Sequence, residues 1–474
     1  MPEKPSAPPV TPPSAPEKPS AARTKSSSKL TNAATEVVRR LTDAGFEAFF
    51  AGGSVRDMLM GRTPDDIDIA TSARPDQVME IFRKTVAVGA AFGVVVVLHR
   101  RFEFQVATFR SDGAYLDGRH PDSVHFSTAR EDVERRDFTI NGMLYDPTTD
   151  RIMDWVGGRD DLAARVVRAI GDPAARIKED RLRMLRAVRF AARFDFRIEP
   201  AAWRAVCEAS DQILQVSWER IRDELTKMFV GRRPHVALRL LESSGLLAQV
   251  LPEVATLRDV AQSAKHHPEG DVLRHVEIML EEMDRIAEER GERPPVELAM
   301  AVLFHDLGKA TCSKFEDGRI TTKGHEREGA KMARTITERL RMSKAQTKTI
   351  AALAADHMKP MFAPHMRPAT LKRLMREDHF PLLLDLFFLD SVGKRGNLDG
   401  WRWLKDRYES TPETELHPPR LLTGKDLIDM GYEPGPKFQE VLDRIEEAQL
   451  DGNVSNADDA RRLVRRILGR PKPR

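Results

Sequence analysis

The segment spanning residues 47–71 constrains the fold of this chain most strongly, because a glycine turn lies between two predicted strands. The apolar run Phe49–Ala51 predicts a buried strand, and Gly52-Gly53 ends it. Ser54 then opens a short predicted helix that extends to Met60. A glycine turn that leads into a helix N-terminus is a structure suited to binding phosphate groups.

Asp66 and Asp68 lie on the second predicted strand of this segment, in an Asp-x-Asp arrangement. Side chains two residues apart on a strand point to the same face of the sheet. The two carboxylates therefore converge beside the glycine turn, and paired carboxylates favour a hard divalent cation such as Mg²⁺. A solvated acidic turn after Pro64 is the alternative, but the neighbouring glycine turn favours the metal site.

Length and composition exclude several classes of protein. A chain of 474 residues is too long for one compact core, and 31% charged with 6% aromatic residues indicates a soluble, helix-rich protein of several domains. No apolar run reaches the roughly 20 residues that a transmembrane helix requires. Cys207 and Cys312 lack metal-binding spacing, and we expect no disulfide and a cytoplasmic location. The net charge of +3 says little about partners.

The N-terminal residues 1–30 are rich in Pro, Ser, Ala and Lys. We expect them to be disordered, because they cannot bury enough apolar surface to offset the entropy of ordering. They also lack the apolar core of a secretory signal. Their basic excess indicates a solvated tail, with contact to RNA as the alternative.

Helical and strand patterns alternate in the next part of the chain. We expect two helices over Ala33–Ala44 and Asp76–Phe82, and a β-hairpin built from Val94–His99 and Phe102–Phe109. Residues 110–130 lack periodicity and are expected to form a long loop. Long loops inside compact domains are usually functional or disordered.

Beyond residue 160 the pattern becomes almost entirely helical. Ile177–Phe194 predicts a strong helix, with arginines at positions 181, 183, 186, 189 and 193. This row is interpreted either as a surface that contacts phosphate groups or as a solvated basic face. The last predicted helix, 457–468, carries four arginines on one side, at positions 461, 462, 465 and 466.

Four motifs occur in order along the chain: Gly52-Gly53-Ser54-Val55-Arg56-Asp57, Asp66-Ile67-Asp68, Arg135-Arg136-Asp137-Phe138-Thr139-Ile140-Asn141 and Glu179-Asp180-x-x-Arg183. Together with the arginine-rich helix, they resemble the bacterial-type (class II) tRNA nucleotidyltransferase and poly(A) polymerase family over about residues 33–470. The resemblance implies template-independent nucleotide transfer to an RNA 3′ end. It also implies tRNA, CTP and ATP as partners.

The resemblance assigns roles to the first three motifs. Asp66 and Asp68 would be the catalytic carboxylates and would hold Mg²⁺. Two divalent ions can activate a 3′-hydroxyl and neutralise the leaving pyrophosphate. The nucleotide-binding residues of these motifs would be Gly52, Gly53, Ser54, Arg56, Arg135, Asp137 and Asn141. An ordinary strand-to-helix junction is the alternative for the last three.

Gln105 departs from the pattern of the superfamily. Polymerase-like sites often add a third carboxylate on a neighbouring strand, where this chain reads Gln105-Val106-Ala107-Thr108-Phe109-Arg110. An amide cannot serve as an anionic ligand, so the number of metal ligands stays open. Glu103 shares the face of Gln105 by the period of two, but we assign it no role.

The fourth motif would select the incoming base. By the resemblance, Asp180 and Arg183 hydrogen-bond the Watson–Crick edges of CTP or ATP, and Arg186 and Arg189 also contact the nucleotide. A salt bridge between Asp180 and Arg183 on a helix surface is the alternative. The loop from Tyr115 to Pro121 resembles a flexible loop that enzymes adding only C tend to lack, so we expect addition of A as well.

A second set of residues, around His305-Asp306-Leu307-Gly308-Lys309, resembles the HD phosphohydrolase superfamily. By this resemblance the metal ligands would be His275, His305, Asp306 and Asp390, with His325 and His357 as the extra ligands of a binuclear version. Such ligands suit Mn, Fe, Ni, Zn or Mg. Metal-bound water there would hydrolyse a phosphoester. A domain kept for shape or RNA docking is the alternative.

These expectations describe an α+β protein with a small mixed-sheet head and a mostly helical remainder. The expected parts are a disordered tail 1–30, a nucleotidyltransferase head 31–165, a helical neck 166–255, an HD domain 256–405 and a helical RNA-binding tail 406–474. The leading hypothesis is addition of CCA to the tRNA 3′ end, with a second, phosphohydrolase activity. A poly(A) polymerase is the first alternative. The second is a phosphohydrolase whose N-terminal region only binds RNA, which intact Asp66 and Asp68 disfavour.

Overall fold

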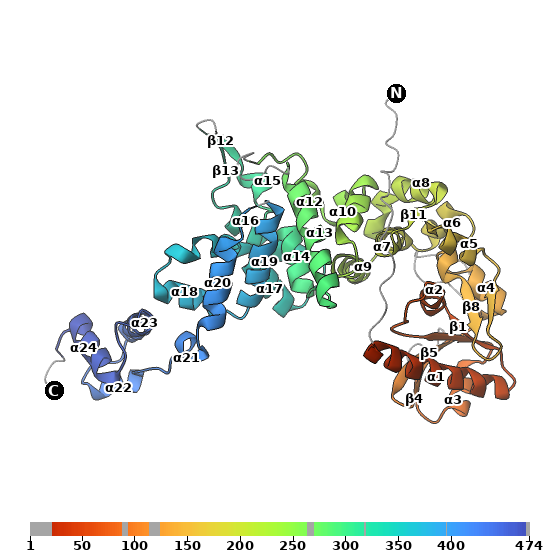
Figure 1. Ribbon diagram of the computed structural model, residues 1–474, viewed down its shortest axis with the longest axis horizontal. Coiled ribbons are helices and arrows are strands. Elements are labelled where there is room, and N and C mark those ends of the chain that lie inside the picture. Colours follow the sequence, from red (N-terminus) through yellow and green to blue (C-terminus); the bar gives the residue numbers. More distant parts are fainter. Residues whose placement is uncertain are drawn as a thin grey trace. The chain divides into compact units, whose positions relative to one another are not determined.

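The chain folds into two compact units. The computed structural model describes residues 21–87, 93–112, 124–262, 270–316, 319–394 and 396–470. The first unit comprises the chain up to Asp180 together with Arg197–Ala202, and the second comprises Arg181–Phe196 and the chain from Trp203 onward. A mixed sheet lies in the first unit, and the second is mostly helical (Figure 1). The expected α+β class is therefore confirmed.

A seven-stranded mixed sheet forms the centre of the first unit (Figure 1). Its strands are β1 Ala48–Ala51, β2 Asp68–Thr71, β3 Thr85–Val86, β4 Val94–His99, β5 Phe102–Thr108, β8 Met143–Asp146 and β9 Arg151–Asp154. They are arranged in the order β3-β4-β5-β2-β1-β8-β9. β2 and β5 run parallel, and the other neighbouring strands run antiparallel. The predicted hairpin corresponds to β4 and β5.

The two faces of this sheet carry different cores. On one face, Phe50 and Ile69 pack against residues of α1 (Ala21–Asp43) and α3 (Pro75–Ile81). On the other face, Ala51 and Ala70 pack with Val133 of α4 (Ala129–Glu134). Because alternate residues of a strand point to opposite faces, Asp68 shares the face of Ala70. The face opposite α1 therefore carries the candidate chemistry.

Shorter elements complete the first unit: α2 Gly53–Leu59, β6 Arg110–Asp112, β7 Val124–Phe126, η2 Thr139–Asn141, α5 Gly158–Ala163, β10 Val166–Val167, α6 Pro173–Glu179 and β11 Arg197–Ile198. The expectation of an unstructured loop over residues 110–130 was wrong at its ends, since β6 pairs with β7 and α4 follows. Strands of three residues are too short to show alternation in the sequence. The predicted flexible loop from Tyr115 to Pro121 lies outside the described residues.

The first helix is longer than predicted. α1 begins at Ala21, so residues 21–30, which we expected within a disordered tail, are helical. The side chains from Ala33 to Leu41 that enter the core anchor this helix to the sheet. Residues 1–20 of the expected tail lie outside the described part of the chain.

The second unit is built almost entirely from helices. They are α7 Arg183–Phe194, α8 Pro200–Glu208, η3 Ser210–Gln215, α9 Trp218–Val230, α10 Pro234–Ser243, α11 Leu246–Val250, α12 Pro252–Ala255, α13 Val272–Arg290, α14 Val296–Phe304, α15 Lys309–Cys312, α16 His325–Arg339, α17 Lys344–Asp356, η4 Pro360–His365, α18 Pro368–Met375, α19 Phe380–Gly393, α20 Asp399–Ser410, α21 Glu413–Leu416, α22 Gly424–Asp429, α23 Lys437–Leu450 and α24 Ala457–Leu468. A small hairpin, β12 Lys314–Glu316 and β13 Arg319–Thr321, interrupts them. Within the ranges given above, none of these helices or those of the first unit has the length and apolarity needed to cross a membrane.

Candidate active sites

Asp66 and Asp68 stand on the same face of the sheet edge. Asp68 is the first residue of β2, and Asp66 lies two residues before that strand. Both side chains are exposed, whereas Ile67 and Ile69 are buried. The alternation typical of a strand therefore continues beyond the last ladder hydrogen bond, and the two carboxylates point to the same side.

The Asp68 carboxyl is electrostatically strained in the absence of a cation. Although solvent reaches this side chain, desolvation by the surrounding protein and the negative charge of Asp66 raise the pKa of Asp68 to about 6. Arg136 acts in the opposite direction and lowers it. A divalent cation bound between the two carboxylates would relieve their repulsion, so this donor set fits Mg²⁺.

Gln105 lies next to Asp68 across the parallel pair of strands. Ile69 of β2 is opposite Val106 of β5, and Asp68 and Gln105 directly precede this pair. The two side chains therefore occupy neighbouring positions on the same face. An amide is found where the sequence pattern of the superfamily led us to look for a third carboxylate. Glu103 shares the face but lies two residues farther along β5.

Gly52 brings a cation against the turn. It precedes α2 with φ 67° and ψ −126°, a conformation that residues with a Cβ atom rarely adopt. A Cβ atom at this position would lie 2.9 Å from Nη1 of Arg136. Glycine is therefore required both by the backbone and by the close approach of the guanidinium. The turn places a positive charge near the two carboxylates, as a triphosphate site requires.

The next two residues of the motif stabilise the turn itself. Gly53 opens α2, and the buried hydroxyl of Ser54 donates to the carbonyl oxygen of Ala51 at 3.0 Å. The hydrogen bond joins the start of the helix to the end of β1. Direct contact of Ser54 with a triphosphate stays a prediction.

Arg56 links the glycine motif to the third motif. Its side chain is 4% exposed; its Nε donates to Oδ1 of Asp57 at 2.9 Å, and its Nη1 donates to Oδ1 of Asn141. Asn141 in turn donates from Nδ2 to Oδ1 of Asp137 at 3.0 Å. These four side chains form one chain of contacts between α2 and η2. We had expected Arg56 to pair with the triphosphate, and here its guanidinium is directed to protein partners.

Asp132 orients the arginine pair and was missed in the sequence. Its carboxylate is buried and accepts from Nη2 of Arg135 at 2.6 Å and from Nη2 of Arg136 at 2.9 Å. Burial raises the pKa of Asp132, but the two guanidinium groups outweigh burial and hold it below its ordinary value. The spacing of three and four residues to the arginines was the available signal.

Arg176 of α6 is a second residue that sequence reasoning missed. Its Nε donates to the carbonyl oxygen of Ile170 at 2.9 Å, and its Nη2 donates to those of Glu134 and Arg136, the latter at 3.2 Å. Its Nη1 also forms an ion pair with Glu179 at 2.7 Å. One side chain therefore ties the arginine pair to the helix that leads to Asp180. Partners about 40 residues away leave no local signal in the sequence.

The base-selecting motif spans a break between two helices. We expected one helix over Ile177–Phe194, which was wrong: α6 ends at Glu179, Asp180 is extended, and α7 begins at Arg183. Ile177 and Leu182 are both buried. They would stand about 140° apart on one straight helix, which could not bury both on one face. Asp180 belongs to the first unit and the buried Arg183 to the second.

The arginines of α7 are held partly by a buried acid. Glu224 of α9 is buried and binds Nε of Arg189 at 2.5 Å, and Arg186 approaches it at 3.9 Å. Burial lowers the pKa of Arg189, with Glu224 acting against the shift. Neither a solvated face nor an open phosphate surface describes Arg189. Direct nucleotide contacts of Arg183, Arg186 and Arg189 stay predictions.

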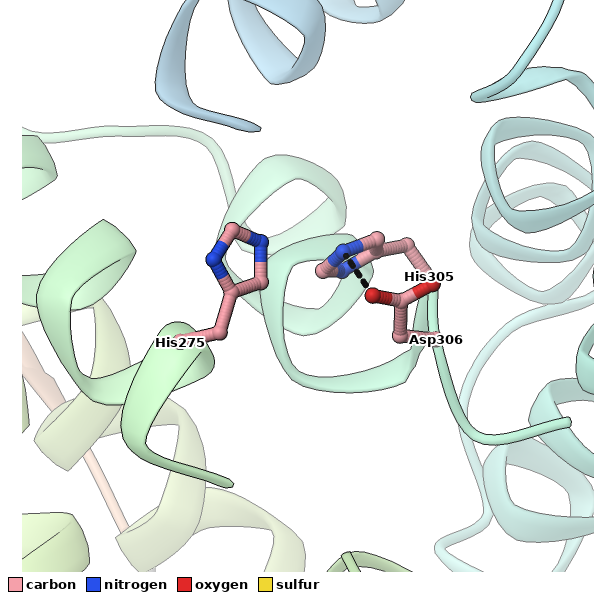
Figure 2. A group of neighbouring side chains, drawn as sticks. All are labelled: His275, His305 and Asp306. Atoms are coloured by element: carbon pink, nitrogen blue, oxygen red, sulfur yellow. Dashed lines mark ion pairs between the residues drawn. The ribbon is translucent and has the colours of Figure 1, made fainter. Parts of the chain in front are cut away.

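The second candidate site is a buried cluster of histidine and aspartate. His305 and Asp306 follow α14 and are buried, with Nε2 of His305 at 3.2 Å from Oδ2 of Asp306. Figure 2 shows His275 of α13 facing this pair. The three side chains bring ligand atoms within 4.8 Å of one another. Burial lowers the pKa of His305, which keeps the imidazole neutral and able to bind a metal.

His325 and His357 form the other half of the cluster with the same aspartate. Their Nε2 atoms lie 3.4 and 3.5 Å from Oδ1 of Asp306. Asp306 therefore contributes to two overlapping groups of ligands, one with His275 and His305 and one with His325 and His357. A carboxylate shared in this way can bridge two metal ions.

Backbone carbonyls fix the direction of three of the imidazoles. The Nδ1 atoms of His305, His325 and His357 contact the carbonyl oxygens of Val302, Thr322 and Ala354 at 3.1, 2.7 and 2.8 Å. A carbonyl oxygen only accepts, so each Nδ1 carries the proton and each Nε2 presents a lone pair to the cluster. This arrangement is typical of metal-binding histidines.

Asp390 completes the expected ligand set from α19. Its Oδ1 lies 3.0 Å from Nε2 of His275, and its Oδ2 lies 2.5 Å from Nζ of Lys394. Burial raises the pKa of Asp390, but Lys394 and His275 outweigh burial and hold it well below its ordinary value. A Cβ atom on Gly393 would lie 2.7 Å from Cε1 of His275, so the glycine makes room for the imidazole.

Gly308 and Lys309 explain the rest of the HD motif. A Cβ atom on Gly308 would lie 2.1 Å from the carbonyl oxygen of His325, so glycine allows α15 to approach α16. Lys309 binds Oδ2 of Asp306 at 2.7 Å and Oε1 of Gln262 at 2.8 Å. Burial raises the pKa of Asp306, but Lys309 and His305 outweigh burial and hold it well below the ordinary value. The carboxylate is thus ready to bind a cation, and the donor set fits two divalent metal ions.

Three family descriptions match successive parts of the chain. Residues 48–168 match "Poly A polymerase head domain", and residues 195–257 match "Probable RNA and SrmB- binding site of polymerase A". Residues 272–391 match "HD domain". The first match contains the Asp66–Asp68 site, and the third contains all the histidines of the buried cluster.

Relatives with similar sequences are CCA-adding enzymes. The enzyme of Geobacillus thermodenitrificans is 43% identical over 223 residues, which cover 47% of this chain and 55% of that protein. The enzyme of Enterococcus faecalis is 44% identical over 199 residues, which cover 42% of this chain and 49% of that protein. The chain thus spans about half the length of these curated relatives.

Solved structures resemble the chain over nearly its whole length. The Bacillus stearothermophilus CCA-adding enzyme in complex with CTP has a TM-score of 0.70 and 28% identity, covering 93% of this chain and 98% of that chain. The Thermotoga maritima CCA-adding enzyme complexed with tRNA has a TM-score of 0.56 and 20% identity, covering 93% and 96%. The second similarity shows a common fold.

Proposed function

We propose that this chain, which belongs to the bacterial-type (class II) tRNA nucleotidyltransferase and poly(A) polymerase family, adds C, C and A to the 3′ end of tRNA. CTP and ATP are the proposed substrates and tRNA the proposed acceptor. The shared face of Asp66 and Asp68 beside the Gly52 turn supports this reaction most directly. Addition of A alone, as in a poly(A) polymerase, is the competing outcome.

The residues of the first unit would divide the work as follows. Asp66 and Asp68 would hold Mg²⁺, which when bound activates the RNA 3′-hydroxyl and neutralises the leaving pyrophosphate. Arg136, held by Asp132, would stabilise negative charge on the triphosphate near the Gly52 turn. Asp137 and Asn141 would position Arg56 and the ribose-binding segment. Asp180 and Arg183 would then select cytosine or adenine by hydrogen bonding.

The proposed domains follow the sequence. We assign the head to residues 31–165, the neck to 166–255, the HD domain to 256–405 and the RNA-binding tail to 406–474. In the tail, Arg461 and Arg462 pair with Asp458 and Asp459 on the first turns of α24. We expect RNA to be held along the neck and tail mainly through its phosphates, and the enzyme to act in the cytoplasm.

Paired substitutions test the assignment of the catalytic carboxylates. We expect Asp66→Asn with Asp68→Asn to abolish transfer of CMP and AMP to tRNA while leaving the melting temperature nearly unchanged. Asp65→Asn is the control, since Asp65 is an exposed neighbour. Transfer that survives in the double variant would place the metal ions elsewhere.

A second activity, metal-dependent phosphoester hydrolysis, is proposed for the buried histidine cluster. The two ligand groups that share Asp306 support a binuclear site in which metal-bound water is the nucleophile. The metal is proposed to be a divalent transition metal or Mg²⁺. A 2′,3′-cyclic phosphate or a phosphomonoester is the expected substrate.

Independent loss of the two activities tests this proposal. His305→Ala with Asp306→Ala should remove metal-dependent phosphate release and spare nucleotide addition. His365→Ala, which alters an exposed histidine at the end of η4, is the control for both assays. A simultaneous loss of both activities would mean that the sites are not independent.

A further inference from the structure

A pocket of about 650 Å³ opens beside the histidine cluster in the second unit. Its lining includes His325 at the start of α16, Lys323 and Arg327 on either side of it, and Lys359, Phe362 and Met366 from the η4 region. This volume lies within the range of sites for small molecules, which is roughly 300–1,000 Å³. The pocket has no role in the functions proposed above.

One side of the pocket offers an aromatic surface. Phe362 of η4 is 52% exposed, and Met358 and Met366 lie on the same lining. A flat ring exposed beside a pocket favours stacking with a planar ligand, because stacking removes apolar surface of both partners from water. A nucleobase is such a ligand, and it stacks on phenylalanine whatever its sequence identity.

Positive charges line the opposite chemistry of the same pocket. Lys323 and Arg327 are exposed, and no ion pair involving either is found among the described residues. Lys359 pairs with Asp356 at 2.7 Å. Glu326 is the one acidic residue of this lining, and its carboxylate lies 3.6 Å from Nδ1 of His325. Cations therefore outnumber the acid, which favours an anionic ligand.

His325 joins this pocket to the buried cluster. Its side chain lines the pocket, and its Nε2 lies 3.2 Å from Nε2 of His357 and 3.4 Å from Oδ1 of Asp306. An anionic group that enters the pocket therefore comes next to one of the two proposed metal positions. The aromatic ring lies apart from the cluster on η4, where the organic part of a ligand can extend.

We propose that this pocket binds a nucleoside phosphate, with the base on Phe362 and the phosphate near His325, Lys323 and Arg327. Its turnover rests on the phosphohydrolase activity proposed above, whereas its binding does not. The nucleoside phosphate is either a free nucleotide or the last nucleotide of an RNA that ends in a phosphate. Both carry the same base, ribose and phosphate, so the pocket chemistry is common to them.

Binding to the metal-stripped full-length chain tests the proposal without turnover. Adenosine 3′-monophosphate and inorganic phosphate would be titrated calorimetrically in EDTA. We expect Phe362→Ala to weaken the nucleotide by about tenfold and to leave inorganic phosphate unchanged, since one stacked base contributes about 1–3 kcal/mol. Lys323→Ala with Arg327→Ala should weaken both ligands. Phe362→Trp should retain nucleotide binding, which separates stacking from a folding defect.

Neighbouring exposed residues supply matched controls. Met361→Ala alters a side chain that is 50% exposed next to Phe362 but absent from the pocket lining. Lys331→Ala removes a cation of α16 that is paired with Glu328 at 2.9 Å. Both variants should bind the nucleotide like the wild type. Nucleotide affinity that is equal in the wild type, Phe362→Ala and Lys323→Ala with Arg327→Ala would overturn the proposal.

Two further comparisons separate the sources and the two proposals. An RNA oligonucleotide ending in a 3′-phosphate that binds more tightly than the mononucleotide identifies RNA as the source, and equal affinity identifies the free nucleotide. With Mn²⁺ added, binding that depends on Phe362 without phosphate release would contradict only the phosphohydrolase activity. Phosphate release that is unaffected by Phe362→Ala would contradict only this pocket assignment.

Discussion

The Nε2 atoms of His325 and His357 lie 3.2 Å apart, and the Nδ1 atom of each imidazole is committed to a backbone carbonyl. If both Nε2 atoms carry lone pairs, their approach is repulsive unless a proton or a cation lies between or beside them. Asp306 adds negative charge at 3.4 and 3.5 Å from the two nitrogens. A metal ion satisfies all three groups at once.

Metal binding should therefore stabilise the second unit. We expect Mn²⁺ to raise the melting temperature of chelator-treated protein; the gain in free energy of unfolding is about 2.7 kcal/mol at 100 times the dissociation constant. His325→Ala should lower the number of ions retained after gel filtration, measured by elemental analysis, and His365→Ala should not. Equal metal content in the two variants would argue against the paired histidines as ligands.

The raised pKa of Asp68 predicts a dependence of stability on pH in the metal-free protein. Its folded-state pKa of about 6 lies above the ordinary value of 3.8. The stability it contributes is therefore fully present below about pH 4 and is lost as the pH rises through about 6. In EDTA, the melting temperature of Asp68→Asn should rise relative to the wild type across this window. A constant difference from pH 4 to pH 7, as expected for Asp65→Asn, would contradict the shift.

Asp180 should govern the choice of nucleotide rather than the chemical step. We expect Asp180→Ala to incorporate UTP and GTP at rates closer to those of CTP and ATP, because the carboxylate that accepts from the exocyclic amine is lost. Total incorporation should persist in an assay with each of the four nucleotides supplied alone. Unchanged selectivity would remove Asp180 from base recognition.

Arg176 should position the triphosphate-binding turn. Arg176→Met leaves three carbonyl acceptors without this donor, and each buried unsatisfied group costs about 1–3 kcal/mol. We expect a higher KM for CTP and ATP and a loss of selectivity, beyond any fall in melting temperature. Arg130→Met is the control, since Arg130 is exposed and pairs with Glu134 at 2.8 Å. A lower melting temperature with unchanged KM and selectivity would indicate a purely structural role.

Local patterns in the sequence predicted much of the head and the buried cluster. The glycine turn, the hairpin of β4 and β5 and helix α24 depend on residues close together in the chain, and they are found where expected. The cluster of His305 and its partners follows from residue types and order, because histidine and aspartate are seldom buried without a role.

Contacts between distant residues could not be predicted. The break at Asp180 interrupts a sequence of good helix formers, and it reflects burial of Ile177 and Leu182 in different directions. Asp132 and Glu224 resemble ordinary charges on amphipathic helices, yet both are buried and hold arginines. The burial of Arg56 was likewise invisible, since only the fold brings Asn141 to its guanidinium.

The most direct test of the account is the product formed on a tRNA that lacks its terminal CCA. The purified chain would receive this tRNA with CTP, with ATP or with both, and the products would be resolved at single-nucleotide length. We predict two added residues with CTP alone and termination after C, C and A with both nucleotides. A long A tail, or phosphate release without extension, would contradict the proposed function.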